Sequence, residues 1–317
     1  MYAFTPYYKS VIWGGDEICR RKGEPAPDAH IGESWEISPV AGCETIVADG
    51  PDKGLTLSEL TLRYGPSLLG KEISEKYCGR FPLLLKIIDA GRDLSVQVHP
   101  GEEMARRLHN CPGKTEMWYV VDHKPGAKIY NGFTRPITPD GYRKMVEQKE
   151  IMDVIQAHDA ANGDVYFVPP GRIHAIGAGN LLIEVQQASD ITYRVYDFDR
   201  LGADGHPREL HTELAAQAIN FSVFSDHRID YDTASRQVEL LSCDYFDVAL
   251  ISPEDDIMHY DIPRDAFAIV ICVEGECTVS SGDDTRSLPL LHSLLVPASE
   301  KTFTVAGRGT LLIAVPK

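Results

Sequence analysis

Short apolar runs that end at Gly, Pro or Asp recur along the chain and constrain its fold more than any other feature. Runs of this length, rich in β-branched and aromatic residues, form strands rather than helices. Turn sequences such as Asn162-Gly163-Asp164 and Pro169-Pro170-Gly171 lie between them. We therefore predict a mainly β protein built as a sandwich or barrel. The runs are Phe81–Ile88, Asp164–Val168, Leu181–Val185, Val238–Ile251, Ala266–Val273, Leu290–Val296 and Thr310–Val315.

Helix signals are few and local. Thr56 followed three residues later by Glu59 is typical of a capped helix start. Pro100 and the acids after it indicate a second short helix running towards His109. The predicted helices span Thr56–Gly70, Pro100–His109, Asp140–Lys149 and Arg208–Asn220. We expect them to decorate the first part of the β structure and to cover its ends.

Two β domains are predicted. Phe221–Gln237 is polar and lacks a long apolar run, which is typical of a connector. The strand-rich block Val238–Lys317 follows it and is consistent with a degenerate copy of the first fold. We place the first domain, which holds most of the chemically active side chains, at residues 1–225, and the second at residues 226–317.

The charge balance excludes some classes of partner. Among 317 residues, 31 Lys and Arg oppose 47 Asp and Glu, which gives a formal net charge of −16. Such a surface repels nucleic acid and anionic lipid, so we predict neither as a partner. A phosphorylated ligand would need a local basic pocket. The N-terminus lacks a signal peptide pattern, and the seven cysteines form no CxxC pair, so we expect a cytoplasmic protein with reduced thiols.

A polar strand face is predicted at Leu94–His99. Side chains alternate along a strand, so Ser95, Gln97 and His99 should face one way, and Leu94, Val96 and Val98 the other. Three polar side chains on one face indicate a strand that lines a polar cavity. The alternative is an exposed strand face on which the histidine is incidental.

A Pro/Gly turn precedes His174. The pattern Gly163, five residues, Pro169, one residue, Gly171, two residues, His174 matches the second motif of the cupin superfamily, in which the histidine binds a metal. The asparagine that follows four residues later in that motif is replaced by Ala178. The first motif, His-x-His, is replaced by Gln97-x-His99, and the next acid that would be costly to bury unpaired is Glu116.

These side chains form a mixed nitrogen and oxygen set that suits Zn²⁺ with one open position, although other divalent ions share this preference. The set is Gln97, His99, Glu116 and His174.

Several ordered motifs in the first 210 residues make the chain similar to type I mannose-6-phosphate isomerases of the short bacterial form, within the cupin superfamily. The segments are Trp13–Gly15, Gly32–Glu36, Pro82–Pro100, Gly113–Tyr119 and Gly163–Arg200. The resemblance implies two cupin-like jelly-roll domains, with helices on the first. It also implies one zinc ion per chain, held by Gln97, His99, Glu116 and His174.

The resemblance further implies a reaction and the residues that perform it. Members interconvert mannose 6-phosphate and fructose 6-phosphate by proton transfer between C1 and C2 through an enediol(ate). Ser95, Lys114 and Arg194 match substrate-binding residues. Arg194, Glu184 and Lys114 match the catalytic group, with Glu184 aligned to a proposed acid/base residue.

Other readings stay open from sequence. The chain could be a non-catalytic sugar-binding metal cupin, or an iron-dependent cupin oxygenase, although Gln97 and Glu116 do not match the ligand triad of the latter. Glu184 could pair with Arg172 or Arg194, and Arg194 with Asp197, in purely structural ion pairs. No sequence feature specifies an oligomeric state.

Overall fold

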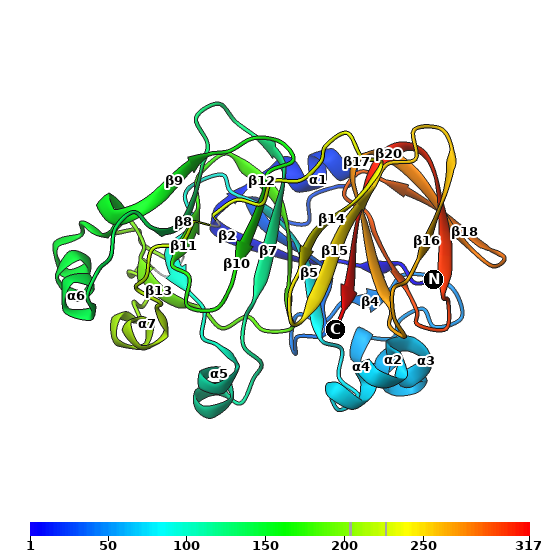
Figure 1. The fold of residues 1–317 in the computed structure, drawn as a ribbon, viewed down its shortest axis with the longest axis horizontal. Coiled ribbons are helices and arrows are strands. Elements are labelled where there is room, and N and C mark those ends of the chain that lie inside the picture. The colour runs from blue at the N-terminus through cyan, green and yellow to red at the C-terminus, as the bar shows by residue number, and fades with distance from the viewer. Residues whose placement is uncertain (203–204, 226) are drawn as a thin grey trace.

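The computed structural model describes residues 1–202, 205–225 and 227–317, and it is mainly β, as predicted (Figure 1). A six-stranded antiparallel sheet lies at the centre of the molecule, with strand order β10-β7-β12-β5-β3-β2. Its strands are β10 (Val165–Val168), β7 (Glu116–His123), β12 (Asn180–Gln187), β5 (Leu83–Asp89), β3 (Ile31–Ile37) and β2 (Tyr7–Gly15).

A five-stranded sheet packs against one face of this central sheet. Its strands, in order, are β13 (Tyr193–Tyr196), β6 (Val96–Val98), β11 (His174–Ile176), β8 (Lys128–Phe133) and β9 (Ile155–Asp159). Trp118 and Leu182 of the central sheet share one apolar cluster with Ile129 and Ile176 of the five-stranded sheet. The two sheets therefore form a sandwich, which holds the predicted site residues.

A seven-stranded sheet lies on the other side of the central sheet. It is built around two long neighbouring strands, β17 and β20 (Figure 1). Its strands are β14 (Gln237–Ser242), β15 (Phe246–Ile251), β16 (Ile257–Asp261), β17 (Ala268–Ser281), β18 (Asp284–Pro289), β19 (Ser293–Val296) and β20 (Thr302–Pro316). A separate short pair joins β1 (Phe4–Thr5) to β4 (Ile46–Val47). Every predicted apolar run contains at least part of a strand.

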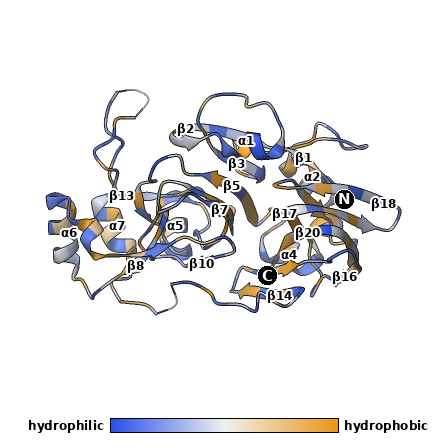
Figure 2. Cartoon of the chain, turned by 90° about the horizontal axis from the view of Figure 1, so that it is seen from above, coloured by the Kyte–Doolittle hydropathy of each residue, from blue (hydrophilic) through white to orange (hydrophobic). Residues whose placement is uncertain are grey.

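One apolar core joins the central sheet to the seven-stranded sheet. Leu83, Leu85 and Ile87 alternate along β5 and belong to the same cluster as Phe246 and Ile313. Ile88 belongs instead to the cluster on the opposite face. Because β5 is covered on both faces, five of its seven residues are hydrophobic (Figure 2).

The predicted helices are present with altered bounds. Thr56 caps α2 through the predicted capping box with Glu59, but Gly65 ends that helix and Pro66 starts a new one. The helix predicted from Arg208 begins only at Thr212, and Arg208 precedes it in a non-helical segment, where it donates to Asp197. The helices are α1 (Glu17–Lys22), α2 (Leu57–Tyr64), α3 (Pro66–Leu69), α4 (Lys71–Lys76), α5 (Glu102–His109), α6 (Pro139–Gln148), α7 (Thr212–Ala218) and the 3₁₀ turn Ile151–Val154.

Five of the helices lie in two places (Figure 1). α6 and α7 cover the outer face of the five-stranded sheet, where Tyr142 and Ala215 pack on Val96 and Val98. α2, α3 and α4 lie beside the seven-stranded sheet instead, and the Ala298 amide donates to Leu68 O. No helix in the described residues is long and apolar enough to cross a membrane.

The described part of the segment between the two β blocks, residues 221–225 and 227–236, runs along the sandwich without helix or regular strand. The Ile229 amide donates to Val165 O at 2.8 Å, and the Tyr231 hydroxyl donates to Gly163 O at 2.9 Å. The predicted domain boundary falls between residues 225 and 226, and residue 226 lies outside the described residues. The division into domains 1–225 and 226–317 stays a prediction.

We predict that Phe267→Ala lowers the free energy of unfolding by about 3–5 kcal/mol, the usual cost of truncating a buried aromatic residue. Phe267 is fully buried and stacks on Phe81 of the first block, with ring centroids 4.4 Å apart. Urea denaturation would measure the change. Leu62→Ala, at a residue 87% exposed, is the control and should change stability by less than about 0.5 kcal/mol. A decrease of less than about 1 kcal/mol in the free energy of unfolding of Phe267→Ala would contradict the shared core.

Candidate metal centre and active site

His99, Glu116 and His174 converge inside the sandwich. His99 directly follows β6, Glu116 begins β7 and His174 begins β11. Glu116 Oε2 lies 3.5 Å from His99 Nε2, and Glu116 Oε1 lies 3.3 Å from His174 Nε2. One ligand atom from each of the three residues lies within 4.8 Å of the others, and all three side chains are buried.

Backbone carbonyls orient both imidazoles. His99 Nδ1 donates to Ile191 O and His174 Nδ1 donates to Arg172 O, each at 2.8 Å. This assignment leaves the Nε2 lone pairs directed at Glu116. Neither Nε2 atom, nor Glu116 Oε1, has a hydrogen-bond partner among the described residues, and Glu116 Oε2 has only the Lys114 ammonium, at 3.0 Å. Buried polar atoms without partners are costly, and a carboxylate with two oriented imidazoles is a set that binds divalent metals. The residues therefore fit a metal ion.

Burial and charge set the protonation states of these ligands. Burial lowers the pKa of His99 to about 4 and also lowers the pKa of His174, so both are neutral at pH 7, as metal ligands must be. Burial would raise the pKa of Glu116. Lys114 Nζ lies 3.0 Å from Glu116 Oε2. Its charge and the two nearby imidazoles outweigh the effect of burial, so the pKa of Glu116 lies well below its usual range. Glu116 is therefore an anion.

Register across the five-stranded sheet brings Gln97 next to the group. Gln97 on β6 is paired with His174 on β11 and with Arg194 on β13. The predicted alternation holds for Val96 and Val98, which pack on the outer core, while Gln97 lines an inner cavity. It is wrong for Leu94, which lines the same cavity because the strand begins only at Val96.

This cavity, of about 200 Å³, contains the remaining predicted site residues: Ser95, Gln97, Lys114, Glu184 and Arg194. Its lining carries five cationic side chains and three acidic ones, in a chain whose net charge is −16. The local basic pocket that a phosphorylated ligand requires is therefore present. The structure brings every predicted site residue into this cavity or into the buried His/Glu/His group beside it, while their individual roles stay predictions.

Glu184 is held by residues on both neighbouring strands. Glu184 Oε1 lies 3.2 Å from Lys86 Nζ, and the Trp118 indole donates to Glu184 Oε2 at 2.9 Å. These three residues are direct cross-strand neighbours on β5, β12 and β7. The sequence suggested that Glu184 could pair with Arg172 or Arg194, but in the structure it pairs with Lys86. Lys114 Nζ lies 4.0 Å from Glu184 Oε1, so one lysine bridges towards both carboxylates.

Arg194 stands free of the ion pair considered for it. Asp197 instead accepts hydrogen bonds from Arg200 and, through both oxygens, from Arg208. Arg194 Nη1 donates to Glu209 O at 3.0 Å, and its buried Nε has no hydrogen-bond partner among the described residues. The guanidinium thus retains an unpaired donor, and the Arg194 side chain lines the cavity.

Sequence reasoning missed Lys86 and Arg208, which also line the cavity. Lys86 stands inside the apolar run Phe81–Ile88, and a charge that is costly to bury unpaired is the same signal that singled out Glu116. Arg208 has no comparable sequence signal. Its partner Asp197 is eleven residues away, a separation that neither strand nor helix periodicity brings together.

Comparison with known proteins identifies the family. A model described as "Phosphomannose isomerase type I, catalytic domain" matches residues 1–135, and one described as "Mannose-6-phosphate isomerase, cupin domain" matches residues 237–316. Gln97, His99 and Glu116 lie in the first match, whereas His174, Glu184 and Arg194 lie between the two.

Curated relatives and solved structures agree with these models. The mannose-6-phosphate isomerase ManA of Bacillus subtilis (strain 168) is 33% identical, over 98% of this chain and 97% of that protein. The mannose-6-phosphate isomerase of Streptococcus mutans is 39% identical, over 66% of this chain and 64% of its own length. A crystal structure of the Bacillus subtilis mannose 6-phosphate isomerase superposes with a TM-score of 0.87 at 33% identity, and covers 99% of this chain and 98% of that one. As its motifs predicted, the chain is an enzyme of the type I phosphomannose isomerase family.

Proposed function

We propose that this chain interconverts mannose 6-phosphate and fructose 6-phosphate with the help of one zinc ion. The observation that carries the proposal is a basic cavity directly beside a buried His/Glu/His group, in a member of this family. The cavity supplies cations for an anionic sugar phosphate, and the buried group supplies metal ligands. Both are needed for this chemistry, and they share Lys114, which lines the cavity and pairs with Glu116.

The proposed zinc ligands are His99, Glu116 and His174, with the Gln97 side-chain oxygen as a fourth. Two neutral imidazoles, a carboxylate and an amide oxygen form a mixed set that leaves room for a further oxygen ligand. Zinc bound there would act as a Lewis acid towards the sugar oxygens and stabilise negative charge on them. Its identity and its stoichiometry of one per chain are part of the proposal.

Substrate binding is assigned to Ser95, Lys114 and Arg194. The unpartnered Nε of Arg194 is a ready donor for an anionic oxygen, and guanidinium groups bind phosphate and oxyanions in charge-assisted hydrogen bonds. The charge of Lys114 is partly neutralised by Glu116, so it suits a polar oxygen of the sugar better than a fully charged phosphate. Ser95, buried at the cavity wall, offers a hydroxyl for orientation.

Glu184 is assigned the proton transfer. Its carboxylate would remove the proton from C2 of mannose 6-phosphate, giving an enediol(ate), and return it to C1 to give fructose 6-phosphate, while the hydroxyl proton moves from O2 to O1. Lys86 and Trp118 hold the carboxylate in one orientation. Arg194 would stabilise the negative charge that develops on the enediolate oxygens.

The two alternatives predict different chemistry. Sugar binding without catalysis does not require a carboxylate such as Glu184, held in one orientation by neighbouring strands, in the same cavity as Lys114 and Arg194. An iron-dependent oxygenase would consume O₂. The simultaneous presence of cations, a positioned carboxylate and metal ligands favours the isomerase.

We predict that the purified chain converts mannose 6-phosphate to fructose 6-phosphate in a coupled assay, that chelation abolishes turnover, and that added zinc restores it. Metal analysis should give one zinc per chain, and oxygen-electrode measurements should show no O₂ consumption. A folded, zinc-loaded sample without turnover would contradict the isomerase proposal and favour the sugar-binding alternative. O₂ uptake by an iron-containing sample would favour the oxygenase.

We predict that His174→Ala loses metal and activity together, because removing one ligand of a three- or four-ligand site costs at least about 10–100-fold in metal affinity. Metal content by mass spectrometry and turnover on the same sample would measure this. His259→Ala, an exposed histidine on β16, is the matched control and should keep both. Full activity in a metal-free His174→Ala sample would disprove the assigned role.

We predict that Arg194→Ala keeps its metal but lowers kcat about 10²–10³-fold, the usual effect of removing one group that stabilises a developing oxyanion. Steady-state kinetics and metal analysis would separate the two effects. Arg135→Ala, an exposed arginine outside the cavity, should match the unchanged chain. Loss of metal from Arg194→Ala would show that the arginine supports the metal group instead.

A further inference from the structure

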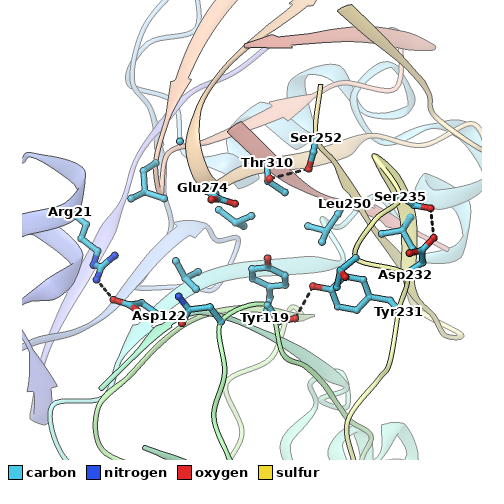
Figure 3. A pocket seen from close by; sticks show the side chains of 18 residues that line it. Arg21, Tyr119, Asp122, Tyr231, Asp232, Ser235, Leu250, Ser252, Glu274 and Thr310 are labelled. Atoms are coloured by element: carbon cyan, nitrogen blue, oxygen red, sulfur yellow. Dashed lines mark hydrogen bonds and ion pairs between the residues drawn. The ribbon is translucent and has the colours of Figure 1, made fainter. Parts of the chain in front are cut away.

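A second cavity, larger than the first, lies between the two β blocks (Figure 3). Its volume is about 470 Å³, within the range of roughly 300–1,000 Å³ typical of small-molecule sites. The floor is formed by Tyr119 and Asp122 of β7, and the opposite wall by Leu250, Glu274 and Thr310 of the seven-stranded sheet. The segment between the blocks closes one end.

Hydroxyl groups dominate the polar lining. Ser252 and Thr310 are hydrogen-bonded to each other at 2.9 Å, and hydroxyls of this kind retain further capacity to donate or accept. The six hydroxyl-bearing residues are Tyr119, Tyr231, Thr233, Ser235, Ser252 and Thr310. Apolar surface lies between them, and its residues are Val121, Val238, Leu250, Val273 and Leu290.

The charges in this cavity oppose those of the first cavity. Arg21 is its one cationic lining residue among those described, and Arg21 is paired with Asp122. The Asp232 carboxylate is already used, because it accepts hydrogen bonds from Ser235 Oγ at 2.7 Å and from the Ala234 amide at 3.0 Å. Glu274 makes no hydrogen bond or ion pair with another described side chain. The net lining charge is negative, so a phosphorylated ligand is disfavoured.

We propose that this interblock cavity binds a neutral polyhydroxylated ligand, of the unphosphorylated sugar class. Hydroxyls and an unpaired carboxylate match the donors and acceptors of a sugar, and the two tyrosine rings with the aliphatic patches match its C–H faces. Asp122 and Asp232 are both engaged, so Glu274 is one carboxylate among six hydroxyl-bearing residues, and the lining offers a ligand mainly neutral hydrogen-bonding groups.

The cavity shares a strand with the candidate active site. Along β7, Tyr119 belongs to the core beside the interblock cavity, whereas Trp118 belongs to the core of the sandwich. The ring centroids of Trp118 and His174 are 5.3 Å apart, and the Trp118 indole donates to Glu184. A ligand on Tyr119 would therefore lie on the back of the strand that carries Glu116 and Trp118. The binding proposal itself does not depend on the proposed isomerase activity.

The test is saturation-transfer NMR of the full chain with D-mannose as the neutral probe and mannose 6-phosphate as the charged one. Glu274→Gln removes the charge and one acceptor oxygen from the cavity, and Tyr231→Phe removes one hydroxyl, so each should weaken D-mannose binding about fivefold or more. Glu276→Gln, an exposed carboxylate two residues along β17 and outside the lining, is the matched control. Arg194→Gln reports binding in the first cavity, and thermal melting confirms that each variant is folded.

Saturable D-mannose binding that survives Arg194→Gln and Glu276→Gln but weakens in Glu274→Gln and Tyr231→Phe would support the proposal. Absence of saturable binding at millimolar concentrations would overturn it. Binding that is lost only in Arg194→Gln would assign the probe to the first cavity and also overturn it. Equal competition by mannose 6-phosphate at the Glu274-dependent site would disprove the argument from charge. None of these outcomes depends on turnover.

Discussion

The buried carboxylate of Glu116 is the charge around which the candidate site is arranged. A carboxylate removed from water costs several kcal/mol unless cations, donors or a metal replace its hydration. Lys114 at 3.0 Å supplies one cation, and two imidazoles at 3.3 and 3.5 Å complete its surroundings. Glu116 Oε1 and the Nε2 atoms of both histidines still have no hydrogen-bond partner among the described residues, which is the strongest physical argument for a metal ion at this place.

One of the two segments that orient the proposed histidine ligands also carries Arg194, the proposed substrate-binding arginine. Ile191 O, which accepts from His99, lies three residues before Arg194, and Arg172 O, which accepts from His174, belongs to the Pro/Gly turn before β11. Displacement of the segment from Ile191 to Arg194 would disturb the metal group and the cavity together. Residues that never contact the sugar are therefore expected to matter for activity through geometry.

The central sheet separates two cavities of opposite character. Alternate residues of β5 and β7 face the sandwich on one side and the seven-stranded sheet on the other, so a single strand contributes to both. The first cavity is basic and carries the proposed chemistry, while the interblock cavity is acidic and rich in hydroxyls. The charge contrast gives one chain two environments with different ligand preferences.

Much of the candidate site follows from local sequence, and the rest does not. The turn before His174, the Gln97-x-His99 pair and Glu116 at the start of an apolar strand each depend on a few neighbouring residues, so pattern alone singled them out. Lys114, Glu184 and Arg194 were identified through the family resemblance. Alternation misplaced Leu94, since it holds only where the chain is extended and paired. Lys86 as the partner of Glu184, and Arg208 as the partner of Asp197, depend on contacts between distant segments.

The sequence by itself determined the strand-rich architecture, the capped helix at Thr56 and the types of side chain available to a metal and to an anionic sugar. These depend on the hydrophobic period, turn residues and capping groups, which act over a few residues. Only the tertiary structure decided that β5, β12 and β7 are neighbours, that the apolar core is continuous between the blocks, and that a cavity remains between them. Strand order and register arise from the simultaneous packing of distant segments, and no local pattern encodes them.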